Sequence, residues 1–157
     1  MPDLTPVGGP VRDVIGVVGA FTMTPDGDTL ITATDRRGRI QLRDPRTGDV
    51  RRAFGRHPAP IQSMAVAPDG RTIATATRQE SVIRLWNVET GALIAQLSRH
   101  GDTVNDLEFS PDGRLLASGG GDSDVGLWFV RAEDAAAKLC GDLAKAIGRG
   151  VPELGCR

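Results

Sequence analysis

One tripeptide recurs at a fixed interval along the chain. Pro-Asp-Gly begins at Pro25, Pro68 and Pro111, so that both intervals are 43 residues. A fixed period in this range is what a row of equivalent supersecondary units leaves in a sequence. The period predicts a repeat protein, whose function should be sought on a repeated scaffold before it is sought in a catalytic motif.

Each repeat has the pattern of a short series of strands. Alternate residues before every tripeptide are apolar, which predicts a half-buried strand entering a hairpin turn where Gly supplies a positive φ. Apolar and β-branched runs after the turn predict two more strands, and Thr-Gly dipeptides introduce a fourth. The sequence therefore predicts antiparallel four-stranded meanders. The expected second strands are 30–34, 73–77 and 115–119, the third strands 40–43, 82–86 and 125–128, and the fourth strands 50–54 and 93–97.

These repeats resemble the WD-repeat (WD40) β-propeller family. The third repeat follows the order and spacing of one blade of that family, the second matches from His57 to Trp86, and the first has Arg43 at the Trp position. The resemblance implies an all-β fold, a partial β-propeller of three four-stranded antiparallel blades. The segments of the third repeat that carry the likeness are His100-Gly101, residues 104–113, Leu116-Ala117-Ser118 and Leu127-Trp128.

The chain divides into a repeat region and a tail. We expect the repeats within residues 1–130, and a helical C-terminal tail at 131–157. From Glu133 to Ile147 apolar residues fall on one stripe at helical spacing, which predicts a short amphipathic helix. This helix packs on its own last blade or docks on another protein. The expected repeat bounds are 11–54, 55–97 and 98–130, with an N-terminal strand or blade junction at 3–10.

Three blades pose a closure problem, because a propeller ring normally takes about four to eight blades. Three explanations stay open. The chain is a piece of a longer propeller, its C-terminal helix caps an open face, or two chains form a head-to-tail homo-oligomer that completes the ring. The last blade also lacks a local fourth strand, which residues 3–7 of the same chain or of a partner would supply.

Composition narrows the function classes. The formal net charge of −1 argues against a general nucleic-acid or membrane-surface binder. The apolar stretch 14–21 is too short to span a bilayer and is not framed as a signal peptide, so a cytoplasmic location is expected. With two cysteines and two histidines no metal spacing occurs, and we expect neither metal nor cofactor. A disulfide between Cys140 and Cys156 stays open, although it would not suit a reducing compartment.

One residue set has the composition of a hydrolase triad. His100, Ser118 and Asp122 match a nucleophilic triad by residue type. The resemblance implies a structural tetrad instead, in which Trp128 donates to Ser118, the hydroxyl reaches His100, and the second ring nitrogen meets Asp122. Buried polar groups need partners, and this chain of bonds pairs all four. We therefore expect no catalytic residue.

The second repeat has the same set in altered form. His57, Thr75, Glu80 and Trp86 would make the second tetrad, but its turn is one residue longer and the bond from Glu80 to the ring is not assured. Two copies of this residue set, spaced by the repeat period, favour a structural role, since catalysis normally needs one specialised site. We expect no such network in the first repeat. Its residues at these positions are Val14, Thr32 and Arg43.

The resemblance implies a non-enzymatic scaffold for protein–protein interaction, with a protein partner bound at the ring face. Bacterial relatives often join such arrays to signalling proteins, which implies a regulatory or sensing module. The alternatives are a ligand-binding or hydrolytic propeller whose site forms only on assembly, a fragment of a larger signalling protein, and a gene remnant. The candidate interface residues, near the starts of first strands, are Gln62, Arg99, Asp102 and Asn105.

Overall fold

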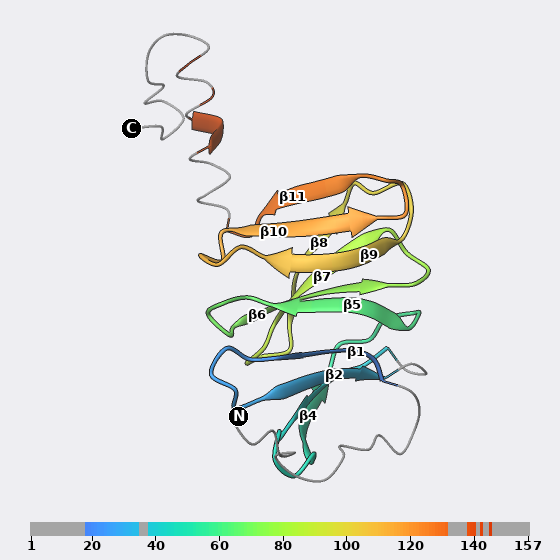
Figure 1. The fold of residues 1–157 in the computed structure, drawn as a ribbon, viewed down its shortest axis with the longest axis vertical. Coiled ribbons are helices and arrows are strands. Elements are labelled where there is room, and N and C mark those ends of the chain that lie inside the picture. The colour runs from blue at the N-terminus through green and yellow to red at the C-terminus, as the bar shows by residue number, and fades with distance from the viewer. Residues whose placement is uncertain (1–17, 35–37, 132–137, 141, 143–144, 146–157) are drawn as a thin grey trace, which may run out of the picture.

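The structure is a computed structural model of the 157-residue chain. It describes residues 18–34, 38–131, 138–140, 142 and 145. Within these residues the chain forms three antiparallel sheets of four, four and three strands. The sheets lie one upon another along the long axis of the molecule, and β1, β5 and β9 follow one another along one side (Figure 1).

Each sheet is a meander in which strands consecutive in sequence are neighbours. The first contains β1 (Val18–Met23), β2 (Leu30–Thr34), β3 (Ile40–Arg43) and β4 (Val50–Phe54). The second contains β5 (Ile61–Val66), β6 (Thr72–Thr77), β7 (Val82–Asn87) and β8 (Leu93–Ser98). The third contains β9 (Val104–Phe109), β10 (Leu115–Gly120) and β11 (Val125–Phe129).

These bounds confirm the all-β, propeller-like fold, and the predicted strands agree with the observed ones to within one residue at each end. The third sheet has three strands over the described residues, and residues 3–7, which were expected to supply its fourth strand, lie outside them. In this sheet β11 pairs with β10 alone, because the chain leaves the sheet after Phe129.

The three Pro-Asp-Gly turns have the same geometry. In each, the Gly N–H donates to the carbonyl three residues earlier at 2.8 Å. The φ values are +76° at Gly27, +69° at Gly70 and +69° at Gly113. A side chain at such a φ costs about 1–2 kcal/mol, which explains why Gly recurs at this point of the period.

Two apolar cores hold the sheets together. Because side chains alternate between the faces of a strand, Ile73 of β6 belongs to the core shared with the first sheet, and Ala74 belongs to the core shared with the third. The first core contains Ile31, Ala33, Ile40, Leu42, Phe54, Ile61, Met64, Ile73 and Trp86. The second contains Ala67, Ala74, Ala76, Ile83, Leu85, Val104, Leu107, Phe109 and Leu116.

The tail is described only in part. Residues 138–140, 142 and 145 are helical, and Lys138 Nζ donates to Asp142 Oδ2 at 3.0 Å. The rest of the helix expected over 133–147, and the segment expected at 3–10, lie outside the described residues. Over the part of the chain that is described, no helix has the length and apolar content needed to cross a membrane.

Candidate functional site

Four polar side chains of the third blade form one connected chain of hydrogen bonds. Trp128 Nε1 of β11 donates to Ser118 Oγ of β10 at 2.9 Å. Ser118 Oγ lies 2.8 Å from His100 Nε2, and His100 Nδ1 lies 3.0 Å from each carboxylate oxygen of Asp122. The loop before β9 is thereby tied to the turn between β10 and β11.

The carboxylate of Asp122 decides the tautomer of His100. Because the carboxylate only accepts, His100 Nδ1 donates to it, and the Ser118 hydroxyl meets the other ring nitrogen, Nε2. Burial of the Asp122 carboxyl works to raise its pKa, but hydrogen bonds from His100 and from the backbone N–H groups of Gly101 and Asp124 outweigh it and hold the pKa below its ordinary value.

The second blade forms a related network with a different end. Trp86 Nε1 donates to Thr75 Oγ1 at 2.9 Å, and Thr75 Oγ1 lies 3.1 Å from His57 Nε2. At the other ring nitrogen stands Arg84, whose Nη1 lies 3.3 Å from His57 Nδ1. Glu80 binds this guanidinium at 2.7 and 2.9 Å. Arg84 therefore lies between Glu80 and His57 and contacts both, in place of the direct hydrogen bond considered from the sequence.

Arg84 reverses the tautomer in this blade. A guanidinium can only donate, so His57 Nδ1 accepts and Nε2 carries the proton. Nε2–H then donates to the Thr75 hydroxyl, which donates in turn to the Arg84 carbonyl at 3.3 Å. Burial of the ring and the positive charge of Arg84 lower the pKa of His57 to about 4, although Glu80 works in the opposite direction.

The first blade contains a shorter network that the sequence argument missed. Arg43, which occupies the Trp position, is buried and donates from Nε to Thr32 Oγ1 at 3.0 Å. Its Nη1 donates to the Gly48 carbonyl at 2.9 Å, and its Nη2 contacts Gln41 Oε1. The expectation that this blade lacks a network is therefore wrong for these two residues, because an Arg Nε–H can replace the Trp Nε1–H as donor. Val14 lies outside the described residues.

Two further residues belong to the networks and were not singled out from the sequence. Gly126 is the cross-strand partner of Ser118, and Arg84 is the cross-strand partner of Thr75. A Cβ on Gly126 would lie 2.6 Å from Ser118 Oγ and 2.8 Å from Trp128 Nε1. Both stand two residues before the Trp, and the observed register places that position directly across the strand pair from the hydroxyl.

The four candidate interface residues fall into two groups. Gln62 of β5 donates from Nε2 to Asn105 Oδ1 of β9 at 2.8 Å, so these two form one contact between neighbouring blades. Arg99 and Asp102 are exposed and stand on either side of the buried His100. The structure therefore places one pair within a blade junction and the other pair on the loop that the third-blade network anchors.

Metal-binding groups are not gathered in the described part of the chain. There, no three side chains of His, Cys, Asp or Glu are grouped so that they could hold a metal ion. Cys140 is disulfide-bonded, and Cys156 lies outside the described residues.

Replacing Gly126 tests the third-blade network. We expect Gly126→Ala to lower the free energy of unfolding by about 1–3 kcal/mol, because the new methyl group overlaps Ser118 Oγ and Trp128 Nε1. Gly119→Ala is the matched control, since a Cβ there meets nothing within 4 Å. Urea unfolding followed by tryptophan fluorescence measures both variants, and equal effects at the two positions would contradict the assigned packing.

Lowering the pH tests the second-blade network. Because the folded pKa of His57 is about 4 and the ordinary value is 6.5, the unfolded state binds this proton first as the pH falls below 6.5. We expect the free energy of unfolding to drop by about 2 kcal/mol between pH 7 and pH 5. His57→Gln removes this contribution. A wild-type chain whose stability stays constant over that interval would contradict the neutral, buried ring.

Comparisons with known proteins agree with this geometry. The family described as "WD domain, G-beta repeat" matches residues 48–87 and 91–128, so each matched stretch begins before the fourth strand of one blade and ends at the third strand of the next. A search of curated proteins finds no match.

Many solved structures are similar to this chain, and two of them serve as examples. One is described as the crystal structure of RRP9 WD40 repeats, with a TM-score of 0.70, 22% identity, and coverage of 76% of this chain and 37% of that chain. The other is described as the structure of U3-55K, with a TM-score of 0.70, 21% identity, and coverage of 76% and 38%. The chain thus spans little more than a third of their length, and at this identity the likeness shows the fold alone.

Two consecutive family repeats lie on sheets that stack as propeller blades do, and the Trp of each donates to a hydroxyl within its own blade. The chain belongs to the WD-repeat family.

Proposed function

We propose that this chain is a non-enzymatic scaffold for protein–protein interaction. WD-repeat domains generally serve as such scaffolds. The observation that supports the same role here is the way in which the triad-like residues of the second and third blades are hydrogen-bonded. Their hydrogen-bonding groups pair with one another inside the blades. Polar groups paired in this way stabilise a fold, and the exposed side chains are then left for recognition.

Burial argues against the alternative of a hydrolase. Ser118 is only 2% exposed, and its Oγ already accepts from Trp128 and meets His100. A nucleophile must be reachable by substrate and by oxyanion donors, which a side chain closed inside a blade is not. The same arrangement recurs around Thr75, where Arg84 stands at the ring nitrogen that a carboxylate contacts in the third blade.

A hollow of about 260 Å³ lies in the first blade. It is lined by Asp28, Asp44, Pro45, Arg46 and Arg51, and none of these residues belongs to the networks of the second and third blades.

The third-blade network supports a binding role for the loop before β9. Asp122 holds both His100 and the backbone N–H of Gly101, the latter at 2.7 Å. Arg99 and Asp102 flank this anchor and are exposed. A loop held in place loses little conformational entropy when a partner binds, so opposite charges at its surface suit recognition of a polar protein surface.

The finer parts of the proposal follow from the same features. A non-enzymatic scaffold affects other proteins by binding them, which favours a regulatory or sensing module. The formal net charge of −1 favours a protein partner over nucleic acid or a membrane surface, and suits a cytoplasmic location.

Removing the Ser118 hydroxyl distinguishes scaffold from hydrolase. We expect Ser118→Ala to lower the free energy of unfolding by about 1–3 kcal/mol, because Trp128 Nε1 and His100 Nε2 each lose a buried partner. Ser98→Ala, at an exposed position of β8, should change it by less than about 0.5 kcal/mol. Ester or peptide hydrolysis by the wild-type chain that Ser118→Ala abolishes while stability is unchanged would favour the enzyme.

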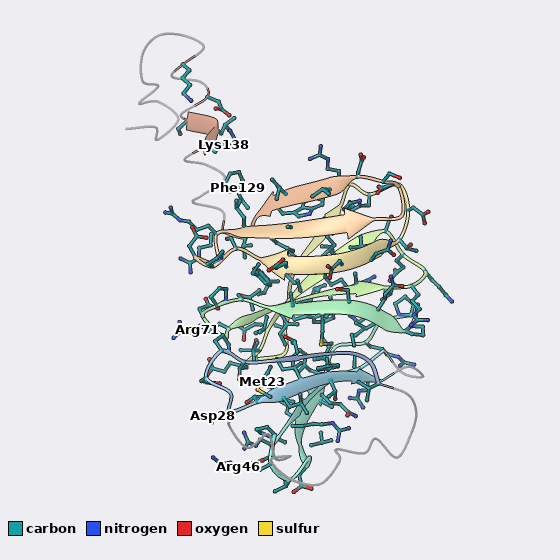
Figure 2. All side chains as sticks on the ribbon, viewed as in Figure 1. Met23, Asp28, Arg46, Arg71, Phe129 and Lys138 are labelled. Carbon is teal, nitrogen blue, oxygen red and sulfur yellow. The ribbon has the colours of Figure 1, made fainter. Side chains whose placement is uncertain are left out.

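Charge reversal tests the interaction surface. We expect Arg99→Glu combined with Asp102→Lys to reduce the recovery of crosslinked protein partners in cells by about tenfold, which corresponds to the loss of one good interfacial contact. Arg71→Glu is the control, since this exposed residue lies at the opposite end of the strands (Figure 2). Quantitative crosslinking followed by mass spectrometry measures all three chains. Equal recovery from all of them would count against a binding role for this loop.

A further inference from the structure

The stack of sheets ends on two apolar faces. On the third sheet, the side chains of Val125, Leu127 and Phe129 are 74%, 63% and 39% exposed, and we call them the β11 face. On the first sheet, Phe21 and Met23 are 72% and 47% exposed, and we call them the β1 face. Figure 2 shows Phe129 beside the third sheet and Met23 beside the first. Exposed large apolar side chains gathered in this way mark an interaction surface.

The repeat itself shows what covers the β11 face. Val125 stands three residues before Trp128, and the residues at that position in the other blades, Ile40 and Ile83, are both 0% exposed. Leu127 corresponds to Leu85, which is 2% exposed. In each earlier blade these side chains belong to the core that the blade shares with the next one. The β11 face is therefore complementary to the face that a blade turns toward the blade before it.

The β1 face is part of such a surface. Phe21 shares its place in the period with Met64 and Leu107, which are 8% and 6% exposed. Both of those side chains pack against the preceding blade, in the first and second cores respectively. The two exposed ends are thus the two halves of one contact that the chain already makes twice internally.

The Pro-Asp-Gly turns supply an independent sign of the same row. A Cβ built on Gly70 would lie 3.8 Å from Pro25 Cδ, and one built on Gly113 would lie 3.4 Å from Pro68 Cδ. Each turn therefore stacks on the turn of the preceding blade. A Cβ on Gly27 meets nothing within 4 Å, so among the described residues no turn stacks on this side of the first one. At the other end of the row, the turn that contains Pro111 is the one on which a further turn could stack.

We propose that two copies of this chain pack head to tail, the β11 face of each against the β1 face of the other. The proposal stands independently of the scaffold function. Because the contact joins two different faces, it either closes a ring or continues as a filament. The described residues of one chain form three sheets, so two copies supply six blades, which lies within the range of about four to eight over which propellers close, whereas three copies would exceed it. The assembly is therefore a closed pair with two identical contacts.

The oligomeric state of the full chain tests this pairing. Light scattering coupled to size-exclusion chromatography should give twice the 16.6 kDa chain mass. Leu127→Ser and Phe21→Ser each remove apolar area at both contacts of the pair. We expect each to weaken the dimer by about 100-fold, since the loss of one buried large side chain is worth about tenfold per contact. Ile94→Ser, at a position of β8 that is 53% exposed and lies on neither face, is the control and should leave the mass unchanged.

Mixing two charged variants distinguishes this arrangement from other dimers. Leu127→Asp and Phe21→Lys should each be monomeric alone, because every contact contains one buried charge. In a mixture, one contact is made of two wild-type faces and the other pairs Asp with Lys, so the dimer mass should return. Circular dichroism of each variant alone checks that it is folded. We expect both to fold, because Leu127 and Phe21 are exposed in the single chain.

Three results would overturn the proposal. The first is a wild-type chain that remains monomeric at high micromolar concentration. The second is a dimer that responds to Leu127→Ser but not to Phe21→Ser, which indicates pairing of two β11 edges with each other. The third is a mass that grows continuously with concentration, which indicates an open filament.

Discussion

The structure depends on the requirement that each sheet bury apolar side chains on both of its faces. In β6 this is met by alternation, with Ile73 packed toward the first sheet and Ala74 toward the third. A sheet that packs on two neighbours has no face left for water. Every polar side chain that points into such a contact must therefore find its partner within the protein.

The three hydroxyls at equivalent places show how this need is met with different residues. Ser118, Thr75 and Thr32 each accept an N–H from the residue at the Trp position, which in the first blade is Arg43. The acceptor is the shared element, and the donors around it vary. Where a carboxylate stands at the far end, His100 holds its proton on Nδ1, and where Arg84 stands there, His57 holds it on Nε2. Local electrostatics thus sets opposite tautomers in two networks of the same outline.

The same packing rule explains why the two ends of the stack differ from its middle. Leu85 is buried because another blade follows it, and Leu127, in the same place of the period, is 63% exposed because in the described chain none does. Under the proposed scaffold function the chain has two kinds of surface. The polar loop around Arg99 and Asp102 would serve specific recognition, and the apolar end faces would serve the proposed pairing of two copies.

The sequence by itself determined the repeat, the turns and the order of strands, because a 43-residue period, Gly at a positive φ and alternating apolar residues are local properties of the chain. The resemblance to the WD-repeat family also singled out His100, Ser118 and Trp128 as one hydrogen-bonded set. The tertiary structure decided what each polar group meets. Arg84 at His57, Arg43 at Thr32 and Gly126 below Ser118 depend on cross-strand register and on side-chain reach, which the period does not encode. Exposure of Val125 was likewise decided only by stacking, since nothing in its own strand distinguishes it from the buried Ile83.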